Sequence, residues 1–190
     1  MWYTANVSDA FVELYHVSEE PGIRVFEPRP SASGPEPVVW AIDGEHLPNY
    51  LLPRDCPRVA FCAGAETTTE DAARFLPDVE RVVAIEASWL RRVVDAKLVR
   101  YTFARERFAL QDPTAGYYVS TDAVSPASEE PLDDLSAELL SSGVELRVLP
   151  SLWMLRERVI HSTLSYSIIR MRNASPPAEG YDAYHPLPGG

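Results

Sequence analysis

Apolar and polar residues change their spacing several times along this chain, and these changes predict a succession of short strands and short helices. Brief apolar or aromatic runs between Pro, Gly, Asn or Asp residues are typical of strands, whereas apolar residues three and four apart are typical of helices. The predicted strands cover residues 12–18, 38–42, 59–63, 81–86, 98–103, 107–110, 117–120 and 144–149.

The helical pattern predicts several short helices and one longer helix. They cover residues 45–52, 67–76, 89–96, 132–140 and 151–172. Ser88 and Ser151 stand where N-caps are expected, and Gly143 stands where a helix is expected to end. The longest helix is predicted from an apolar series at helical spacing, Leu152, Leu155, Val159, Leu164 and Ile168.

Strands and helices in this order do not alternate regularly, as they would in a doubly wound sheet. We therefore expect an α+β fold: a single domain over residues 12–172, with a mixed, mainly antiparallel split sheet and short helices. Residues 1–11 are expected to be a lead-in, and residues 173–190 a flexible tail rich in Pro, Gly and Tyr. Four prolines and one glycine in residues 28–37 predict an irregular surface loop, either a flap over a site or a simple connector.

Charge and composition narrow the class of protein. A formal net charge of −11 at pH 7 makes duplex nucleic acid an unfavourable partner, whereas a local basic pocket can still bind a small phosphorylated ligand. Hydrophobic residues make up 46% of the chain, enough for a sizeable core. No apolar run approaches the ~20 residues that cross a bilayer, and the first residues lack a signal-peptide pattern. We therefore expect a cytoplasmic protein without a membrane span.

Several standard sites are missing from the sequence. The nine glycines form neither GxGxxG nor GxxxxGKS/T, and there is no GxSxG elbow. The four histidines are scattered without the spacing of paired ligands, so we expect no metal site. Cys56 and Cys62 fit no zinc pattern and are expected to be reduced. Cys56, which lies between Arg54 and Arg58, is either a structural thiol or a reactive one.

Polar and aromatic side chains at the ends of predicted strands remain as a candidate site. His16 lies where the first strand gives way to a loop, a common position for functional side chains. Arginine offers phosphate a planar fork of donors, and aromatic rings offer a flat face to a heterocycle. We therefore expect a nucleotide-type small molecule to bind at some of the residues His16, Ser18, Arg24, Arg29, Trp40, Tyr50, Arg54, Tyr117 and Tyr118.

Three of these segments resemble the motifs of ADP-ribosyltransferase-like proteins. Residues 14–18, LYHVS, are similar to the first motif of that superfamily, a strand that ends in a histidine. Residues 38–42, VVWAI, look like the second motif, and residues 116–120, GYYVS, look like the third. The resemblance implies an ADP-ribosyltransferase-like fold, with NAD as the cofactor and ADP-ribosyl or 2′-phosphate transfer as the reaction.

The resemblance also implies roles for individual residues. The third motif commonly carries a catalytic glutamate that stabilises an oxocarbenium-like transition state, and here Gly116 or Tyr117 stands in its place. The related RNA 2′-phosphotransferases work without that acid and rely on His and Arg. The implied catalytic residues are His16 and Tyr117, and the implied cofactor-binding residues are Ser18, Arg24, Arg29, Trp40, Tyr50 and Arg54.

The chain also resembles, over about residues 14–174, a bacterial family of small uncharacterised proteins. They share the segments LYHVSEEPGIRVFEPR, LPNYLLPRDCPR, AGYYVS and SLWMLRERVIHSTLSYSIIRMRNA. Two other functions stay open. One is a non-catalytic protein that binds a partner through arginines of the predicted helix 151–172. The other is a nucleotide hydrolase that uses the carboxylates Glu19, Glu20 and Glu27.

Overall fold

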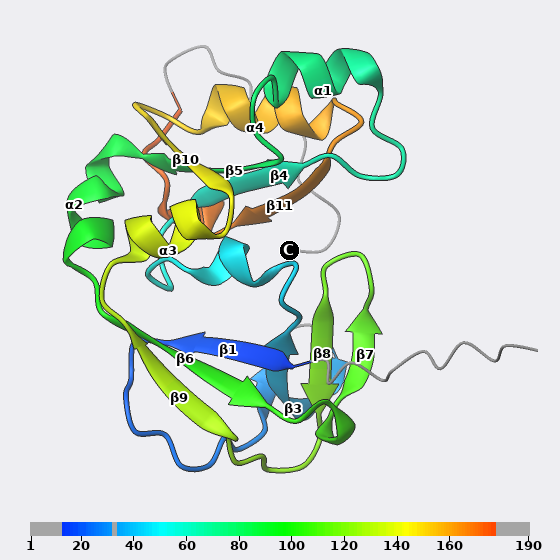
Figure 1. The fold of residues 1–190 in the computed structure, drawn as a ribbon, viewed down its shortest axis with the longest axis vertical. Helices are drawn as coiled ribbons and strands as arrows, with labels where there is room; N and C mark the ends of the chain where they lie inside the picture. The colour runs from blue at the N-terminus through cyan, green and yellow to red at the C-terminus, as the bar shows by residue number, and fades with distance from the viewer. Residues whose placement is uncertain (1–12, 32–33, 178–190) are drawn as a thin grey trace, which may run out of the picture. The chain divides into compact units, whose positions relative to one another are not determined.

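The computed structural model describes residues 13–31 and 34–177 of the chain (Figure 1). The predicted lead-in, residues 1–11, lies outside the described residues, as do residues 178–190 of the predicted tail. The α+β class is confirmed, because mainly antiparallel strands are combined with four short α-helices.

The contacts of the chain fall into two compact units, and each unit uses two separate stretches of sequence. Unit 1 contains the described residues up to Arg54 and residues 97–134. Unit 2 contains residues 55–96 and the described residues from Leu135 onward. The assignment of residues 12–172 to one domain stays a prediction.

Unit 1 is an antiparallel sheet in which strands far apart in the sequence pair with each other (Figure 1). Its strands are β1 (Leu14–Ser18), β2 (Arg29–Ser31), β3 (Gly34–Ile42), β6 (Leu98–Phe103), β7 (Ala109–Asp112), β8 (Tyr117–Ser120) and β9 (Ser128–Leu132). The order is β7-β8-β3-β1-β6-β9, and β2 pairs with β3 off this path. Two 3-10 helices, η1 (Leu47–Tyr50) and η2 (Arg105–Arg107), belong to the same unit.

Alternating residues of these strands bury one face of the unit 1 sheet. The core on that face contains Leu14, Val39, Ala41, Val99, Tyr101, Phe103, Phe108 and Val124. Phe26, from the segment between β1 and β2, packs its ring against the rings of Tyr101 and Phe103. Backbone hydrogen bonds between Phe26 and Val124 fix this segment across the core.

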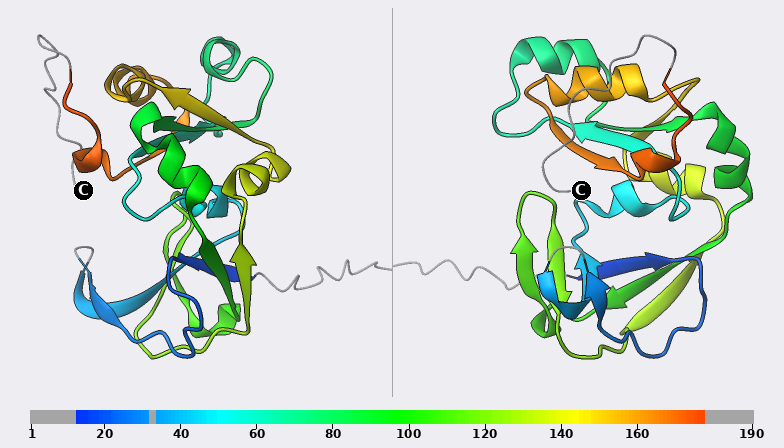
Figure 2. Two further views of the ribbon diagram at one scale, coloured as in Figure 1. Left: turned by 90° about the vertical axis from the view of Figure 1, so that its left-hand side faces the viewer. Right: turned by 180° about the vertical axis from the view of Figure 1, so that it is seen from behind.

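Unit 2 is a four-stranded sheet with helices on both faces (Figure 2). Its strands are β4 (Arg58–Cys62), β5 (Arg81–Glu86), β10 (Val144–Leu149) and β11 (Ser165–Ile169), in the order β10-β5-β4-β11. Only β10 and β5 are parallel. The helices are α1 (Thr69–Phe75), α2 (Ala87–Asp95), α3 (Leu135–Ser141) and α4 (Trp153–Ile160), followed by the 3-10 helix η3 (Met171–Asn173).

Apolar side chains of α1 and α4 pack on one face of this sheet. Phe75 and Val159 share a core with Val59 and Phe61 of β4 and with Val82 of β5. Helices α2 and α3 pack against each other and against β5 and β10. Because β5 is covered on both faces, its run of apolar residues is continuous rather than alternating, as the sequence predicts.

The prediction of an irregular loop over residues 28–37 is wrong. Residues 29–31 form β2, and β3 begins at Gly34. The two segments pair at Arg29↔Val38 and Ser31↔Gly34, with a register shift between them. Proline cannot donate to a ladder, but it is tolerated in short, irregular edge pairing of this kind.

The prediction of one helix over residues 151–172 is also wrong. Helix α4 ends at Ile160, and residues 165–169 form β11, which pairs with β4. The turn between them is fastened to α1, because Thr163 donates from its backbone nitrogen and its hydroxyl to Asp71. The spacing of Leu164 and Ile168 fits a strand as well as a helix, and pairing with β4 makes this segment a strand.

The loss of this helix changes the partner-binding alternative. Arg156 and Arg158 lie on α4, whereas Arg170 and Arg172 lie beyond β11. Arg156 is buried, and only Arg158 and Arg172 are exposed. The arginines therefore do not form one helical face for a partner.

Smaller differences concern element ends. The strands predicted at 81–86, 98–103, 117–120 and 144–149 are confirmed. The helix predicted at 45–52 is the single 3-10 turn η1. Glu86, not Ser88, occupies the N-cap of α2, and its side chain makes no capping bond. Strand β9 is polar and contains Pro131, so no apolar pattern indicated it.

Candidate functional site

The ring of His16 is bound to the backbone of a neighbouring strand. Its Nδ1 atom lies 3.0 Å from the carbonyl oxygen of Trp40 on β3. A carbonyl oxygen only accepts hydrogen bonds, so Nδ1 carries the proton and Nε2 of the neutral ring remains an acceptor. Since β1 pairs with β3 only at Tyr15↔Ile42, the imidazole supplies a donor where the ladder does not continue.

The surroundings of His16 keep its ring uncharged. Burial lowers the pKa of His16 from its usual value of 6.5, and the positive charges of Arg54 and Arg29 lower it further. The hydrogen bond to Trp40 acts in the opposite direction. The ring also meets the edge of Phe26, with centroids 5.0 Å apart. His16 is therefore a neutral imidazole at neutral pH, with two guanidinium groups close enough to act on its charge.

The side chains of His16 and Trp40 point to opposite faces of the unit 1 sheet. His16 pairs with Tyr101 of β6, which belongs to the buried core, and side chains at paired positions share a face. Trp40 alternates with Val39 and Ala41, which point into that core. The imidazole therefore meets β3 through the carbonyl group of Trp40 and not through the indole.

The turn after β1 joins Ser18 and Arg54 to the site. The hydroxyl of Ser18 accepts a hydrogen bond from the backbone nitrogen of Glu20 over 3.0 Å. A carboxylate oxygen of Glu19 accepts one from the backbone nitrogen of Arg54 over 2.9 Å. Glu19 thus holds the Arg54 segment next to the end of β1. Glu19 and Glu20, two of the carboxylates considered for a hydrolase, belong to this exposed turn.

Tyr101 fixes the same turn and was not among the predicted site residues. Its hydroxyl donates to the carbonyl oxygen of Glu20 over 2.8 Å and accepts from the backbone nitrogen of Ile23 over 3.0 Å. The side chain is fully buried, as the alternation of β6 indicates, but only the pairing of β1 with β6 places it beside His16. Tyr101 is a positioning residue for the segment that carries Arg24.

Three predicted aromatic residues come together on the other face. The rings of Trp40 and Tyr117 lie 5.5 Å apart in a T-shaped contact, because β3 and β8 pair with Trp40 opposite Val119 and Ile42 opposite Tyr117. The hydroxyl groups of Tyr117 and Tyr50 are 2.5 Å apart and form a hydrogen bond. These three residues are the aromatic cluster.

A tight turn positions Tyr117. Gly116 has a φ of +66°, which L side chains rarely adopt, and a Cβ atom there would lie 2.3 Å from Nδ1 of His46. Asp43 accepts hydrogen bonds from the backbone nitrogen and the ring of His46 over 2.9 and 2.8 Å. The backbone nitrogen of Asp43 donates to the carbonyl oxygen of Gly116 over 3.1 Å. Glycine is therefore required directly before Tyr117.

Two further predicted residues differ in their relation to His16. Arg29 lies opposite Val38, on the face that carries Trp40, and lowers the pKa of His16. Arg24 is exposed and is not among the groups that act on His16. Tyr118 packs at the margin of the core. Of the two arginines considered for phosphate, Arg29 is therefore the one associated with the histidine.

An open pocket of about 300 Å³ lies beside the aromatic cluster. It is lined by Val38 and Trp40 of β3, by Val119 of β8 and by polar residues that include Glu36 and Thr121. The pocket lies on the Trp40 face of unit 1, where it offers an aromatic and apolar surface.

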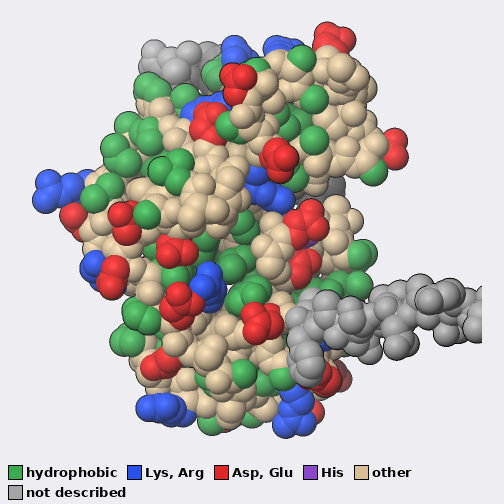
Figure 3. Space-filling model, in the orientation of Figure 1, with side chains coloured by type: hydrophobic (Ala, Val, Ile, Leu, Met, Phe, Trp, Pro, Cys, Tyr) green, Lys and Arg blue, Asp and Glu red, His purple; other side chains and the backbone are tan. Residues whose placement is uncertain are grey.

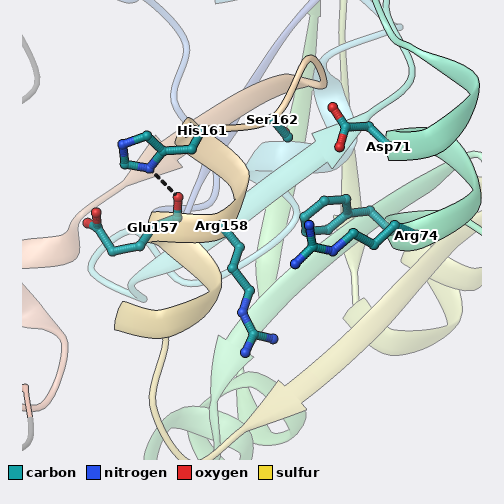
Figure 4. A pocket seen from close by; sticks show the side chains of 7 residues that line it. Asp71, Arg74, Glu157, Arg158, His161 and Ser162 are labelled. Carbon is teal, nitrogen blue, oxygen red and sulfur yellow. Dashed lines mark hydrogen bonds between the residues drawn. The ribbon is translucent and has the colours of Figure 1, made fainter.

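Unit 2 has a second open pocket of about 300 Å³, between α1 and α4 (Figure 4). Arg74 and Arg158 extend into it from the two helices. Phe75 also lines it. His161 donates from Nδ1 to the carbonyl oxygen of Glu157 over 2.8 Å. Of the residues that line this pocket, Arg158 was considered as a partner-binding arginine, and none belongs to the His16 site.

Three further findings concern metal ligands, membrane-spanning helices and the Cys56 thiol. Within residues 13–31 and 34–177, no three His, Cys, Asp or Glu side chains gather as metal ligands. No helix in that part of the chain is long and apolar enough to cross a membrane. Burial raises the pKa of the Cys56 thiol to about 11, so this thiol is a poor nucleophile in the folded protein.

Comparison with known proteins adds a family but no activity. The chain matches the model of a family of unknown function, DUF6886, over residues 15–174. The chain belongs to this family. The resemblance to a family of small uncharacterised proteins is thereby confirmed. No curated protein and no solved structure matches the chain. The ADP-ribosyltransferase-like resemblance stays a prediction.

Proposed function

We propose that unit 1 binds a nucleotide of the NAD or ADP-ribose type at His16. The observation that carries this proposal is the electrostatic environment of the ring, on whose charge both Arg29 and Arg54 act. A chain with a net charge of −11 repels phosphate over much of its surface. Two guanidinium groups within electrostatic reach of a neutral imidazole provide a local exception, and their planar forks suit phosphate oxygens.

The hydrogen bond to Trp40 supports a role for His16 in orienting a ribose. Nδ1 is occupied by the carbonyl oxygen of Trp40, so Nε2 is left as an acceptor in a fixed direction. A ribose hydroxyl is a suitable donor for such an atom. Ser18 supports the site indirectly, because its hydroxyl forms the turn that follows β1.

The aromatic cluster supports the assignment of the base or nicotinamide ring to Trp40, Tyr50 and Tyr117. The aromatic cluster and the His16 ring lie on opposite faces of the sheet, and Trp40 contacts both, through its indole and through its carbonyl group. A dinucleotide has rings at both ends and phosphates in the middle, so its base or nicotinamide ring suits the aromatic cluster and its phosphates suit the arginines.

Transfer of an ADP-ribosyl or 2′-phosphate group is the reaction that this proposal includes. The superfamily glutamate is absent from the β8 strand, and the hydroxyl group of Tyr117 forms a hydrogen bond with Tyr50. In this mechanism His16 and Tyr117 are the catalytic residues. The phosphates are bound by Arg29 and Arg54, and no carboxylate takes part.

Calorimetric titration with NAD, ADP-ribose and a short RNA that bears a 2′-phosphate tests the proposal. We expect Arg29→Ala and Arg54→Ala each to weaken binding about tenfold or more, because hydrogen bonds to charged groups contribute about 1.5–3 kcal/mol. Arg107→Ala, which removes an exposed arginine of the same unit, is the matched control and should leave the affinity unchanged. Absence of binding at millimolar ligand, or equal affinity of the His16→Ala variant, would refute it.

On the face shown in Figure 3, acidic and basic side chains are interspersed and form no large patch of one sign. This face therefore offers no broad electrostatic surface of one sign to a macromolecular partner.

A further inference from the structure

The segment after β11 is bound to the rest of unit 2 through Asn173 and Ser175. Asn173 donates from Nδ2 to the carbonyl oxygen of Asp55 over 2.8 Å. Ser175 donates from its backbone nitrogen and from its hydroxyl to the Oε2 atom of Glu86, each over 2.9 Å. We call residues 170–177 the strap. Its contacts join the sequence just before β4 to the end of β5.

A third contact orients the strap. The carbonyl oxygen of Ser175 accepts a hydrogen bond from the indole nitrogen of Trp153, at the start of α4, over 2.7 Å. Ser175 is therefore bound through its nitrogen, its hydroxyl and its carbonyl group, although the residue is itself exposed. Such complete pairing of one exposed serine indicates a specific contact and not a chain end that merely lies on the surface.

Glu86 is an unusual anchor, because its side chain is fully buried. Its Oε2 atom accepts both bonds from Ser175, whereas its Oε1 atom is buried without a hydrogen-bond partner among the described residues. Burial of an unpaired carboxylate oxygen is costly. Ser175 of the strap thus binds a buried carboxylate that has further capacity to accept hydrogen bonds.

Other polar groups lie at the same edge of the sheet, close in sequence to Asp55, whose carbonyl oxygen binds Asn173 of the strap. Arg58, which is 2% exposed, begins β4, and Cys56, which is fully buried, lies two residues before it. Both Arg58 and Glu86 act on the charge of the Cys56 thiol, so an anion, a cation and a thiol lie within electrostatic reach of one another. The parallel strands β5 and β10 end at this edge, with Glu86 paired to Leu149. In open α/β sheets, ligands bind at such carboxyl ends.

The first residue of the strap is strained. Arg170 has a φ of +54° and is the only residue other than glycine with a positive φ among residues 13–31 and 34–177. A side chain in this left-handed region costs about 1–2 kcal/mol. Strain of this kind concentrates at segments that switch between conformations. Release of the strap would relieve it, and this lowers the free energy of opening.

We propose that the strap is a reversible closure, latched by Ser175 on Glu86, over a polar site formed by Glu86, Arg58 and Cys56. In the closed state these groups are shielded from water. In the open state Glu86 is free to accept hydrogen bonds from a small ligand with hydroxyl or N–H donors, the groups by which Ser175 now binds it. This site lies within unit 2 and is independent of the nucleotide site proposed for unit 1.

The rate at which iodoacetamide alkylates Cys56 in the native, full-length chain reports on opening. Cys62 lies at the other end of β4 and is half-buried, so its rate in the same sample shows whether a variant loosens β4 away from the strap. We expect Ser175→Ala and Asn173→Ala each to accelerate alkylation of Cys56 about fivefold, the factor for loss of one hydrogen bond, and the double variant about 25-fold. The rate at Cys62 should stay the same.

Ser141→Ala is the matched control, because it also removes one serine hydroxyl bond in unit 2, at the end of α3. It should change neither rate. Parallel acceleration at Cys56 and Cys62 in the strap variants would overturn the proposal, since the strap would then be an ordinary part of the folded unit. An unchanged rate at Cys56 in the double variant would overturn it as well.

Discussion

The backbone carbonyl of Trp40 on β3 accepts a hydrogen bond from the imidazole of His16 on β1, 3.0 Å away. We expect His16→Phe to lower the free energy of unfolding by about 1–2 kcal/mol, because phenylalanine fills the space beside Phe26 but cannot donate to the carbonyl. His16→Asn, which retains a donor near the position of Nδ1, should lose less. Urea denaturation of both variants measures the difference. Equal stability of the two variants would contradict this role of the hydrogen bond.

The lowered pKa of His16 predicts a pH dependence of stability. At a pH between the folded-state pKa and the usual value of 6.5, the unfolded chain binds a proton that the folded chain does not. Stability therefore falls as the pH drops below about 6.5 and levels off once the folded ring is also protonated. Melting temperatures from pH 5 to 8 should show a smaller decline for His16→Asn than for the native protein. An identical decline would assign the effect to other groups.

A comparison of Gly116 with Gly22 distinguishes the stability cost of backbone strain from the cost of steric crowding. Both have a positive φ, but a Cβ atom at Gly22 meets nothing within 4 Å, whereas one at Gly116 lies 2.3 Å from His46 and 2.5 Å from Asp43. We expect Gly22→Ala to cost about 1 kcal/mol and Gly116→Ala at least about 1 kcal/mol more, since it also breaks the Asp43–His46 contact. Chemical denaturation measures both, and equal losses would contradict the predicted crowding.

The bonds between Thr163 and Asp71 predict acid sensitivity in unit 2. Thr163 donates to the carboxylate of Asp71 from its nitrogen and its hydroxyl, each over 2.7 Å, and these bonds lower the pKa of Asp71 from its usual 3.8. Their stabilising effect is present above that value and is lost as the pH falls through the folded-state pKa. In Thr163→Val the pKa of Asp71 should move back toward 3.8, as an NMR titration of its carboxyl group would show.

Thr121→Val, at an exposed threonine of unit 1, is the control for this titration. It should leave the pKa of Asp71 unchanged. If Thr163→Val also left it unchanged, the hydroxyl bond would not be the cause of the shift.

The elements that the sequence predicts best are those whose pattern depends only on burial. Strand β5 contains a continuous apolar run and β10 begins as an alternation of apolar and charged residues, and the predicted bounds of both match. Strand β9 is polar, so its formation depends on pairing with β6, which a local pattern does not contain. Residues 164–168 fit both a helical and a strand period, and the free edge of β4 decided between them.

For the candidate site too, the sequence indicates which residues to consider, whereas only strand pairing shows which of them meet. Sequence reasoning selected His16, Trp40 and Tyr117, and the structure brings Trp40 and Tyr117 into ring contact. It places the imidazole on the other face, because the single pair Tyr15↔Ile42 fixes the register between β1 and β3. Glu86 was not selected, since a charged residue at the end of an apolar run is usually solvated and only packing shows that it is buried.

The interleaving of the two units has a consequence for synthesis and for proteolysis. Strand β1 obtains its partner β6, and β5 obtains its parallel partner β10, only after a long intervening stretch has been made. A nascent chain that has just passed residue 96 therefore holds an incomplete sheet from each unit. Pairing between such distant segments slows folding. No single peptide-bond cleavage can release either unit as one intact fragment.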